Sequence, residues 1–402
     1  MTRAAVSSKV LARKRLRIWT ILLTSSLAFL APTAVAPGLP ALQADYAHVD
    51  NAAFLSPLVL TMPLLFIALA GPFAGYFVDR YGRRNVLISS TLLYGLAGLA
   101  GLVIEPIVLL LVSRALLGIF LAGIMTSVTA LIGDYFIGDE RNRVAGLQGA
   151  FMSLGTLTFV VLAGLLSEIH WRVAFGLFAV VLVLLPLMLL SLYEPDRGRD
   201  TGAGASEPPP TMQQWTTIAL YCTLAFVTMV LLFMTPAQTA FFLVEIGVEN
   251  PARAGLVIGI FNLSAGLASL SYRRIRGHLS SESLFALSFA IGGIGYVMTG
   301  TADSFTAAMI AMGIGGFSVG AFLPNINLAI ISRASMSVRG RALGALTTMF
   351  FLGQFFSPVY SVPIASASSV GTAFVISGYA LIILSAGFGL AVIYRRLRSR
   401  TR

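Results

Sequence analysis

Long apolar runs constrain this chain more than any other feature of its sequence. About twelve of them approach or exceed the ~20 residues that cross a hydrocarbon core of ~30 Å. Only 11% of the 402 residues are charged, whereas a soluble domain carries roughly 25%. The runs lack the period-two alternation of barrel strands, so we expect each to be a helix. The sequence predicts an all-α integral membrane protein with spans near residues 18–40, 52–78, 86–104, 107–132, 145–167, 172–193, 215–243, 253–272, 283–301, 304–331, 342–366 and 370–394.

Basic residues lie almost entirely on one side of these spans. Of the 27 Lys and Arg, 24 fall at the chain ends or in alternate loops, Arg172 and Arg253 fall on the other side, and Arg114 lies inside a span. An excess of Lys and Arg marks the cytoplasmic side of a membrane protein. We therefore expect an even number of spans and two cytoplasmic termini. The formal net charge of +11 then reflects orientation in a lipid bilayer, and no nucleic-acid partner is expected.

A polar segment divides the spans into six and six. Residues 194–214 are rich in Gly, Pro and charge, as a flexible linker is. We expect an N-terminal six-helix bundle at 1–193, a cytoplasmic linker at 194–214, and a C-terminal bundle with a basic cytoplasmic tail at 215–402.

The two halves repeat each other. Gly118 recurs 198 residues later as Gly316, and Gly155 recurs at the same offset as Gly353. Two weaker correspondences, at offsets of 195 and 204, keep the same order. Parallel six-helix repeats of this kind build transporters whose substrate site lies between the halves near the membrane midplane.

The most specific local pattern is GPFAGYFVDRYGRR, at the end of the second span. Gly75 permits close helix approach, and Gly82 permits a tight turn. Asp79 places a negative charge where a helix N-terminus or an Arg can meet it. A stop-transfer cluster would explain Arg83 and Arg84, but not the Asp-Arg and Gly spacing.

This pattern resembles the signature loop of the major facilitator superfamily, Gly-x-x-x-Asp-Arg-x-Gly-Arg-Arg. The resemblance implies a fold of two pseudo-symmetric six-helix bundles that works by alternating access, in the cell inner membrane. It also implies that the loop contributes to a cytoplasmic charge network that holds the halves in the outward-facing state. The matching residues are Gly75, Asp79, Arg80, Gly82, Arg83 and Arg84.

The family also places a partner acid at the end of the fourth helix. Asp134 fits that place, so we pair Asp134 with Arg83 and Asp79 with the start of the eleventh span near Arg341. A solvated helix-end carboxylate is the alternative for Asp134. The second-half copy of the loop, YRRIRG, has no Asp, so it does not predict a second, symmetric network.

Arg114 is the candidate for coupling transport to protons. It lies about eight residues into its span, ~12 Å deep at 1.5 Å per residue, where a charge is costly and functional by default. The surrounding pattern resembles the family's Arg-x-x-x-Gly motif, which in proton-coupled exporters is thought to take part in proton transfer. A side chain that snorkels to the interface is the alternative. An acidic partner is expected, but no carboxylate lies clearly at the midplane, and Glu105 and Asp45 are the nearest.

The fifth span tests the exporter interpretation. The family's antiporter motif ends in Gly-Pro-x-x-Gly-Gly, and here only the final small pair, Ala163-Gly164, is kept. An exporter and an uptake carrier therefore both remain open.

Polar and aromatic residues inside the spans are the candidates for a substrate cavity. Each can instead bridge neighbouring helices. An aromatic cavity with a few amides and one buried cation favours amphipathic cargo, and two segments resemble those of drug and siderophore exporters of the family. The candidates are Phe233, Gln238, Asn262, Asn325, Asn327 and Gln354.

An enzyme is not expected. The three histidines lie in loops or at helix ends, and the single Cys222 rules out a CxxC metal site. We expect no catalytic residue, no metal and no cofactor, and no phosphate loop for ATP. The predicted function is proton-driven efflux of amphipathic small molecules such as drugs, siderophores or metabolites. The alternative is uptake or facilitated transport of a small metabolite. We expect a monomer whose partners are its substrate, protons and the bilayer.

Overall fold

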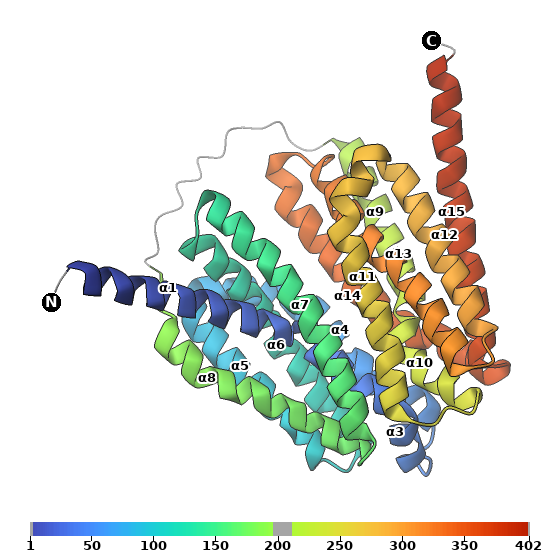
Figure 1. Ribbon diagram of the computed structural model, residues 1–402, viewed down its shortest axis with the longest axis horizontal. Coiled ribbons are helices and arrows are strands. Elements are labelled where there is room, and N and C mark those ends of the chain that lie inside the picture. Colours follow the sequence, from blue (N-terminus) through green and yellow to red (C-terminus); the bar gives the residue numbers. More distant parts are fainter. Residues whose placement is uncertain (1–2, 196–210, 401–402) are drawn as a thin grey trace. The chain divides into compact units, whose positions relative to one another are not determined.

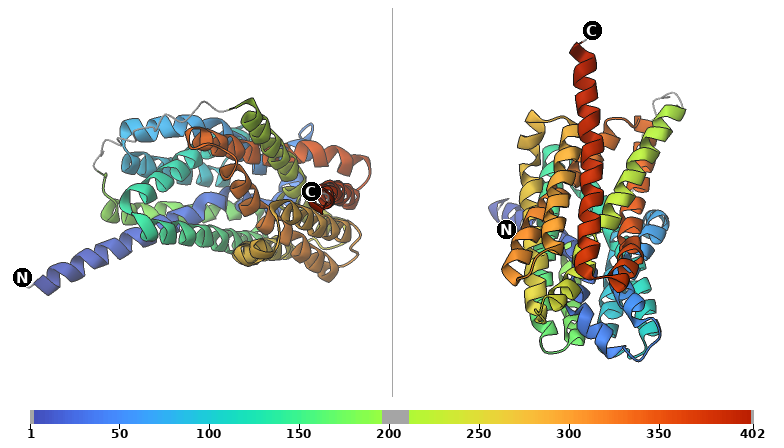
Figure 2. Two further views of the ribbon diagram at one scale, coloured as in Figure 1. Left: turned by 90° about the horizontal axis from the view of Figure 1, so that it is seen from above. Right: turned by 90° about the vertical axis from the view of Figure 1, so that its right-hand side faces the viewer.

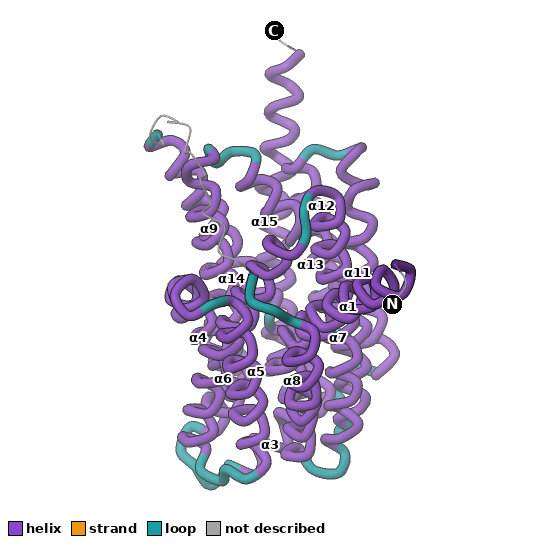
Figure 3. Tube along the Cα trace, turned by 90° about the vertical axis from the view of Figure 1, so that its left-hand side faces the viewer, coloured by secondary structure: helices purple, strands orange, loops and turns teal. Residues whose placement is uncertain are grey.

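The computed structural model describes residues 3–195 and 211–400, and nearly all of them are helical (Figures 1 and 3). Within these ranges the structure contains no strand. Twelve helical segments are long and apolar enough to cross a membrane, so the predicted all-α fold with twelve spans is confirmed. The elements are α1 (Arg3–Ser26), η1 (Leu27–Phe29), α2 (Leu30–Val35), η2 (Ala36–Gly38), α3 (Leu39–Asp45), α4 (Ala52–Tyr81), α5 (Arg83–Leu99), η3 (Ala100–Leu102), α6 (Ile107–Tyr135), α7 (Gly138–Ser167), η4 (Trp171–Phe178), α8 (Ala179–Ser191), α9 (Met212–Leu232), α10 (Met234–Glu245), α11 (Pro251–His278), α12 (Ser281–Gly300), α13 (Phe305–Ile331), α14 (Met336–Ala367) and α15 (Val370–Arg400).

Packing divides the chain into two compact units. Unit 1 runs to Val35 and resumes from Val59 to the linker, while unit 2 takes Ala36–Leu58 and the chain after the linker. Within unit 2, η2 and α3 of that short segment pack against α10. The predicted linker at 194–214 lies mostly outside the described residues.

Equivalent glycines mark equivalent helix crossings in the two units. A Cβ on Gly118 of α6 would lie 2.2 Å from the carbonyl oxygen of Pro63 on α4. A Cβ on Gly316 of α13 would lie 2.1 Å from that of Phe261 on α11. Both the glycines and their partners are 198 residues apart. The predicted repeat is therefore present in the packing, because only glycine lets these backbones approach so closely.

A second pair of crossings repeats in the same way. A Cβ on Gly155 of α7 would lie 2.6 Å from the carbonyl oxygen of Ser26 on α1. Its counterpart Gly353 of α14 would place a Cβ 2.5 Å from that of Phe226 on α9. The first and fifth helices of each repeat thus cross at a glycine.

A proline interrupts the seventh span at Phe233, between α9 and α10. Pro236 has no N–H to donate to the Leu232 carbonyl four residues earlier. The Tyr296 hydroxyl donates to that carbonyl instead, at 2.7 Å, and lies 2.8 Å from Thr235 Oγ1. The freed carbonyl is therefore satisfied by a side chain from α12.

Aromatic rings hold three helices of unit 2 together. Phe285 and Phe289 on α12 contact Phe322 on α13 and Phe388 on α15, with ring centroids 5.1 to 5.8 Å apart. Figure 2 shows α15 running alongside α12, in agreement with their packing. This core holds α12 against α13, and a pair of opposite charges lies at the adjoining ends of these two helices.

Candidate functional site

The signature loop forms a sharp turn at one end of unit 1. We call this end, where α4 meets α5 and α6 meets α7, the basic end of unit 1. The basic end of unit 2 is the end where α11 meets α12 and α13 meets α14. Between α4 and α5, Gly82 has φ +95°, a backbone conformation that favours glycine. A Cβ there would also lie 2.8 Å from a carboxylate oxygen of Glu194. The turn therefore needs glycine for its backbone angle and for the space that Glu194 occupies.

The ion pair predicted between Arg83 and Asp134 is present. Arg83 lies at the start of α5, and its Nη1 bonds to Asp134 Oδ2 in the last turn of α6. The two side chains are 30% and 23% exposed, so the pair is partly shielded from solvent. It joins the third and fourth spans at the basic end.

A third charged residue, Glu194, completes this cluster. Its Oε1 accepts a hydrogen bond from the backbone N–H of Arg83 at 2.7 Å, and its Oε2 accepts one from that of Arg84 at 2.9 Å. Arg84 Nε in turn donates to the Leu192 carbonyl at 2.9 Å. The first N–H groups of a helix have no partner within the helix, and α5 begins after Gly82, which has no side chain to cap them. Glu194 supplies that cap from the end of the sixth span.

Two contacts of α1 reach the same end of unit 1. The Arg17 guanidinium lies 4.9 Å from the Tyr135 ring centroid and 4.4 Å from that of Tyr193. The Tyr135 hydroxyl donates to the Tyr193 carbonyl. Lys14 pairs with Glu140 at 2.7 Å. Sequence reasoning identified none of these partners, because they are far apart along the chain.

The remaining residues of the loop differ in their surroundings. Asp79 is exposed, and Arg80 Nη1 donates to the Tyr76 hydroxyl at 2.8 Å. A Cβ on Gly75 would meet no atom of unit 1 within 4 Å, so no close approach inside this unit requires that glycine. The predicted partner of Asp79, Arg341, belongs to unit 2, where its guanidinium lies 5.8 Å from the Trp215 ring. Their pairing stays a prediction.

Arg114 is enclosed within unit 1. It is 0% exposed and is the one charged side chain among the buried residues of the described chain, so it does not snorkel. Its Nη2 donates to the carbonyls of Ala97 at 2.8 Å and Gly98 at 3.2 Å on α5. Its guanidinium lies 4.7 Å from the Phe175 ring and 5.7 Å from the Phe178 ring on η4. Carbonyl oxygens and ring faces both attract a cation.

The acid expected beside Arg114 is not found among the described residues. Besides the two carbonyls and two rings, its partner is Ser113 Oγ at 3.3 Å. Within the same residues, its Nη1 is buried and has no hydrogen-bond partner. A buried donor in this state is uncommon and calls for an explanation.

Two of the cavity candidates bridge helices of unit 2. Gln238 is 2% exposed and its Nε2 donates to Ser361 Oγ at 2.9 Å. Asn325 is 0% exposed; its Oδ1 accepts from Tyr272 at 3.3 Å and from Ser281 Oγ at 3.0 Å, and its Nδ2 donates to the Ser281 carbonyl at 2.9 Å. Both amides make the helix-bridging contacts that were the alternative to substrate binding.

The other four candidates are only partly buried. Asn262 and Asn327 donate to carbonyls of their own helices at 2.8 Å. Gln354 Nε2 approaches the sulfur of Met229 at 3.8 Å, and its Oε1 has no hydrogen-bond partner within the described chain. Phe233 lies at the break between α9 and α10. These side chains keep hydrogen-bonding capacity or apolar surface that a ligand can use.

The chain is similar to known transporters. A family model described as Major Facilitator Superfamily matches residues 21–358. The 3-(3-hydroxy-phenyl)propionate transporter of Escherichia coli (strain K12) is 25% identical over 337 residues, which are 81% of each protein. Multidrug resistance protein 1 of Bacillus subtilis (strain 168) is 32% identical over 181 residues, 44% of this chain and 46% of that protein. The chain thus spans less than half the length of the second relative.

A solved structure shares the fold over nearly the whole chain. It is a bacterial homolog of the human lysosomal transporter Spinster, in an inward-facing and unoccupied conformation. The TM-score is 0.71 at 16% identity, and the match covers 97% of both chains.

Proposed function

This chain belongs to the Major Facilitator Superfamily, and from that premise we propose that it exports amphipathic small molecules by alternating access, driven by protons. The family makes the chain a multipass membrane transporter and not an enzyme. The direction of transport, its coupling to protons, the class of cargo and a monomeric state are all parts of this proposal.

The match to a multidrug resistance protein is the observation that carries the export proposal. The scarcity of buried charge supports an amphipathic cargo, because Arg114 is the one buried charged residue of the described structure. A strongly charged cargo needs compensating charges in a desolvated site. The partly buried candidates Phe233, Asn262, Asn327 and Gln354 offer aromatic, amide and apolar contacts instead, and we propose that they contact the cargo. Gln238 and Asn325 then act by bridging helices.

We propose that the basic end of each unit faces the cytoplasm, with both termini, in the cell inner membrane. The one-sided distribution of Lys and Arg supports this orientation. In this orientation the Arg83–Asp134 pair and its Glu194 cap belong to a cytoplasmic charge network. That network also includes Gly75, Asp79, Arg80, Gly82, Arg84 and Arg341.

Arg114 is proposed as the coupling residue. Its unpartnered Nη1 leaves one buried donor for a transient acceptor. Replacing Arg114 with Ala is expected to remove the dependence of transport on the proton gradient. The control is Arg172→Ala, since Arg172 also donates to a backbone carbonyl, that of Ile104 at 2.6 Å, and stacks on Trp171. An Arg114→Ala protein with an unaltered pH dependence of transport would remove this residue from the mechanism.

A second candidate function has its own support. The relative that matches 81% of the chain is named as a transporter of 3-(3-hydroxy-phenyl)propionate, a carboxylate whose alkyl chain carries an aryl ring. Uptake of an aryl carboxylate on the same fold is therefore the alternative, in which the buried Nη1 of Arg114 supplies a positive charge for the substrate anion.

Inverted membrane vesicles distinguish the two functions. A panel of cationic dyes, neutral drugs and 3-phenylpropionate is offered from outside, with the proton gradient imposed and then collapsed. Export predicts gradient-dependent accumulation of amphipathic dyes or drugs inside inverted vesicles. Phenylpropionate transport in right-side-out vesicles, with no dye accumulation in inverted ones, would contradict export and support uptake.

A further inference from the structure

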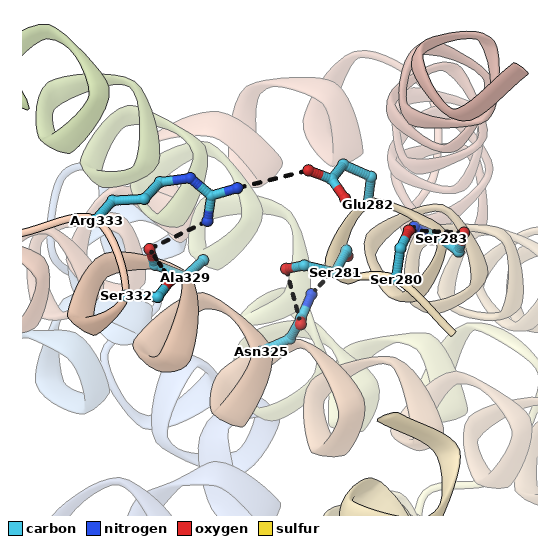
Figure 4. Close-up of polar contacts among 8 residues, drawn as sticks. All are labelled: Ser280, Ser281, Glu282, Ser283, Asn325, Ala329, Ser332 and Arg333. Atoms are coloured by element: carbon cyan, nitrogen blue, oxygen red, sulfur yellow. Dashed lines mark hydrogen bonds and ion pairs between the residues drawn. The ribbon is translucent and has the colours of Figure 1, made fainter. Parts of the chain in front are cut away.

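The basic end of unit 2 holds an ion pair that the sequence pattern did not predict. Glu282 lies in the first turn of α12, and Arg333 lies just beyond the end of α13. Arg333 Nη2 and Glu282 Oε1 are 3.5 Å apart (Figure 4), and the side chains are 35% and 15% exposed, respectively. Arg333 Nη1 also donates to the Ala329 carbonyl at 3.2 Å.

This pair lies at the corresponding helix ends of the repeat, one residue beyond the positions equivalent to the pair in unit 1. Glu282 lies 199 residues after Arg83, and Arg333 lies 199 residues after Asp134, one residue more than the 198-residue offset of the glycine crossings. In both units one partner starts the third helix of the repeat and the other ends the fourth. The charges are exchanged: the base that starts α5 corresponds to the acid that starts α12. The second-half loop has no Asp, but unit 2 has a pair of opposite polarity at the next helix start.

Helix dipoles distinguish the two polarities. A helix N-terminus carries a partial positive charge and a C-terminus a partial negative one. Glu282 and Arg333 each lie beside the helix end that attracts them. Arg83 lies at an N-terminus and Asp134 in the last turn of a helix, so each opposes the dipole beside it. The dipoles of its own helices support the pair in unit 2, whereas in unit 1 the negative charge at the start of α5 comes from the Glu194 carboxylate.

Additional contacts fasten the pair in unit 2 to three helices. Arg333 lies over the Tyr221 ring of α9, 5.2 Å from its centroid. Asn325 on α13, fully buried, bonds to both Ser281 Oγ and the Ser281 carbonyl at the start of α12 (Figure 4). An exposed ion pair alone contributes little, but here the two charges join helix ends that other contacts already hold.

We propose that Glu282 and Arg333 form a polarity-inverted clamp that keeps the basic ends of α9, α12 and α13 together throughout the transport cycle. The changes that open and close the basic end are then left to the pair in unit 1. Glu282 acts as a positioning residue for Arg333. The persistence of the clamp through the transport cycle rests on the proposed function, whereas the existence of the clamp does not.

Thermal unfolding of the purified full-length protein tests the clamp without any substrate. Glu282→Gln and Arg333→Gln are each expected to lower Tm by about 2 °C, and the double variant no more than the larger single effect. Additive losses would show that the two residues do not act together. Glu282→Arg combined with Arg333→Glu keeps a pair but opposes both dipoles, so its Tm is expected below that of the wild type. A Tm at or above the wild-type value would overturn the polarity argument.

Reversible cross-linking tests whether the clamp stays closed during transport. Glu282→Cys with Arg333→Cys is made in a Cys222→Ser background and joined by a bis-methanethiosulfonate reagent. Transport of a cargo that the wild type moves is expected to be unchanged after cross-linking and after reduction. The matched control joins Arg83→Cys and Asp134→Cys in unit 1, where transport is already slowed by the loss of the pair and cross-linking is expected to slow it further until the cross-link is reduced. Arrest by the cross-link in unit 2 would overturn the proposal; a wild type that moves no cargo would contradict the proposed function and leave the unfolding result in force.

Discussion

The basic end of each unit has an ion pair between the start of its third helix and the end of its fourth, and the two pairs have opposite polarity. In unit 1, Arg83 and Asp134 oppose the helix dipoles beside them, and Glu194 caps α5 from the end of the sixth span. In unit 2, Glu282 and Arg333 agree with the dipoles, and α12 is capped by its own Ser280, whose Oγ accepts from the Ser283 N–H at 3.1 Å. The repeated scaffold thus has an ion pair at the corresponding helix ends of both units, one residue apart in register and opposite in sign. We propose that the pair in unit 1, whose charges oppose the adjacent helix dipoles, is the one that breaks and re-forms.

The largest difference between the units is expected at the loop glycines. Gly82→Ala forces a side chain into φ +95° and toward the Glu194 carboxylate at 2.8 Å. We expect the free energy of unfolding to fall by about 1–3 kcal/mol and transport to fall with it. The matched control is Gly277→Ala, since Gly277 lies within α11 and a Cβ there would meet nothing within 4 Å. Thermal unfolding and vesicle transport measure both, and equal tolerance of the two changes would contradict the comparison.

Neutralising one partner of each pair separates stability from transport. Asp134→Asn is expected to slow transport about tenfold, because it removes the contact that joins α5 and α6 in the proposed network. Glu282→Gln is expected to lower Tm and leave transport near the wild-type rate. Initial rates at matched protein levels in vesicles provide the test. A slower rate for Glu282→Gln than for Asp134→Asn would show that transport depends more on the pair in unit 2 than on the pair in unit 1, which contradicts the proposal.

The smallest of these effects is expected at the caps. Glu194→Gln weakens the two bonds to the start of α5 and should cost about 1 kcal/mol of stability, with a loss of transport as the Arg83–Asp134 pair weakens. Glu245 provides a control in unit 2, where its carboxylate accepts from the N–H groups of Val370 at 2.7 Å and Gly371 at 3.3 Å. Glu245→Gln should cost similar stability and leave transport unchanged. If both variants slow transport equally, the effect of Glu194 is one of folding alone.

The sequence predicted the features whose signals are local or repeated. Twelve apolar runs became twelve spans, and glycines at a constant offset became equivalent helix crossings. The pairing of Arg83 with Asp134 was also predicted, because a family motif names both positions. These features share a pattern that is visible within one segment or at a fixed interval.

The residues that sequence reasoning missed depend on partners far along the chain. Glu194 caps a helix that starts 111 residues earlier, and the one hint is that Gly82 cannot cap α5 itself. Gln238 looks like a ligand-binding amide until Ser361, 123 residues away, is placed beside it. The sequence does not predict the pair in unit 2, because the second-half copy of the loop has no acid and Glu282 lies at the following helix start.

Gradient-driven transport by wild-type and Asp79→Asn proteins tests the central claim most directly. The substitution removes one charge of the proposed network from an exposed position, so the protein should fold with an unchanged Tm. The account predicts that inverted vesicles with the wild type accumulate an amphipathic dye while the proton gradient lasts, and that Asp79→Asn vesicles accumulate about tenfold less. Wild-type turnover in the Asp79→Asn protein, or no accumulation by the wild type, would contradict it.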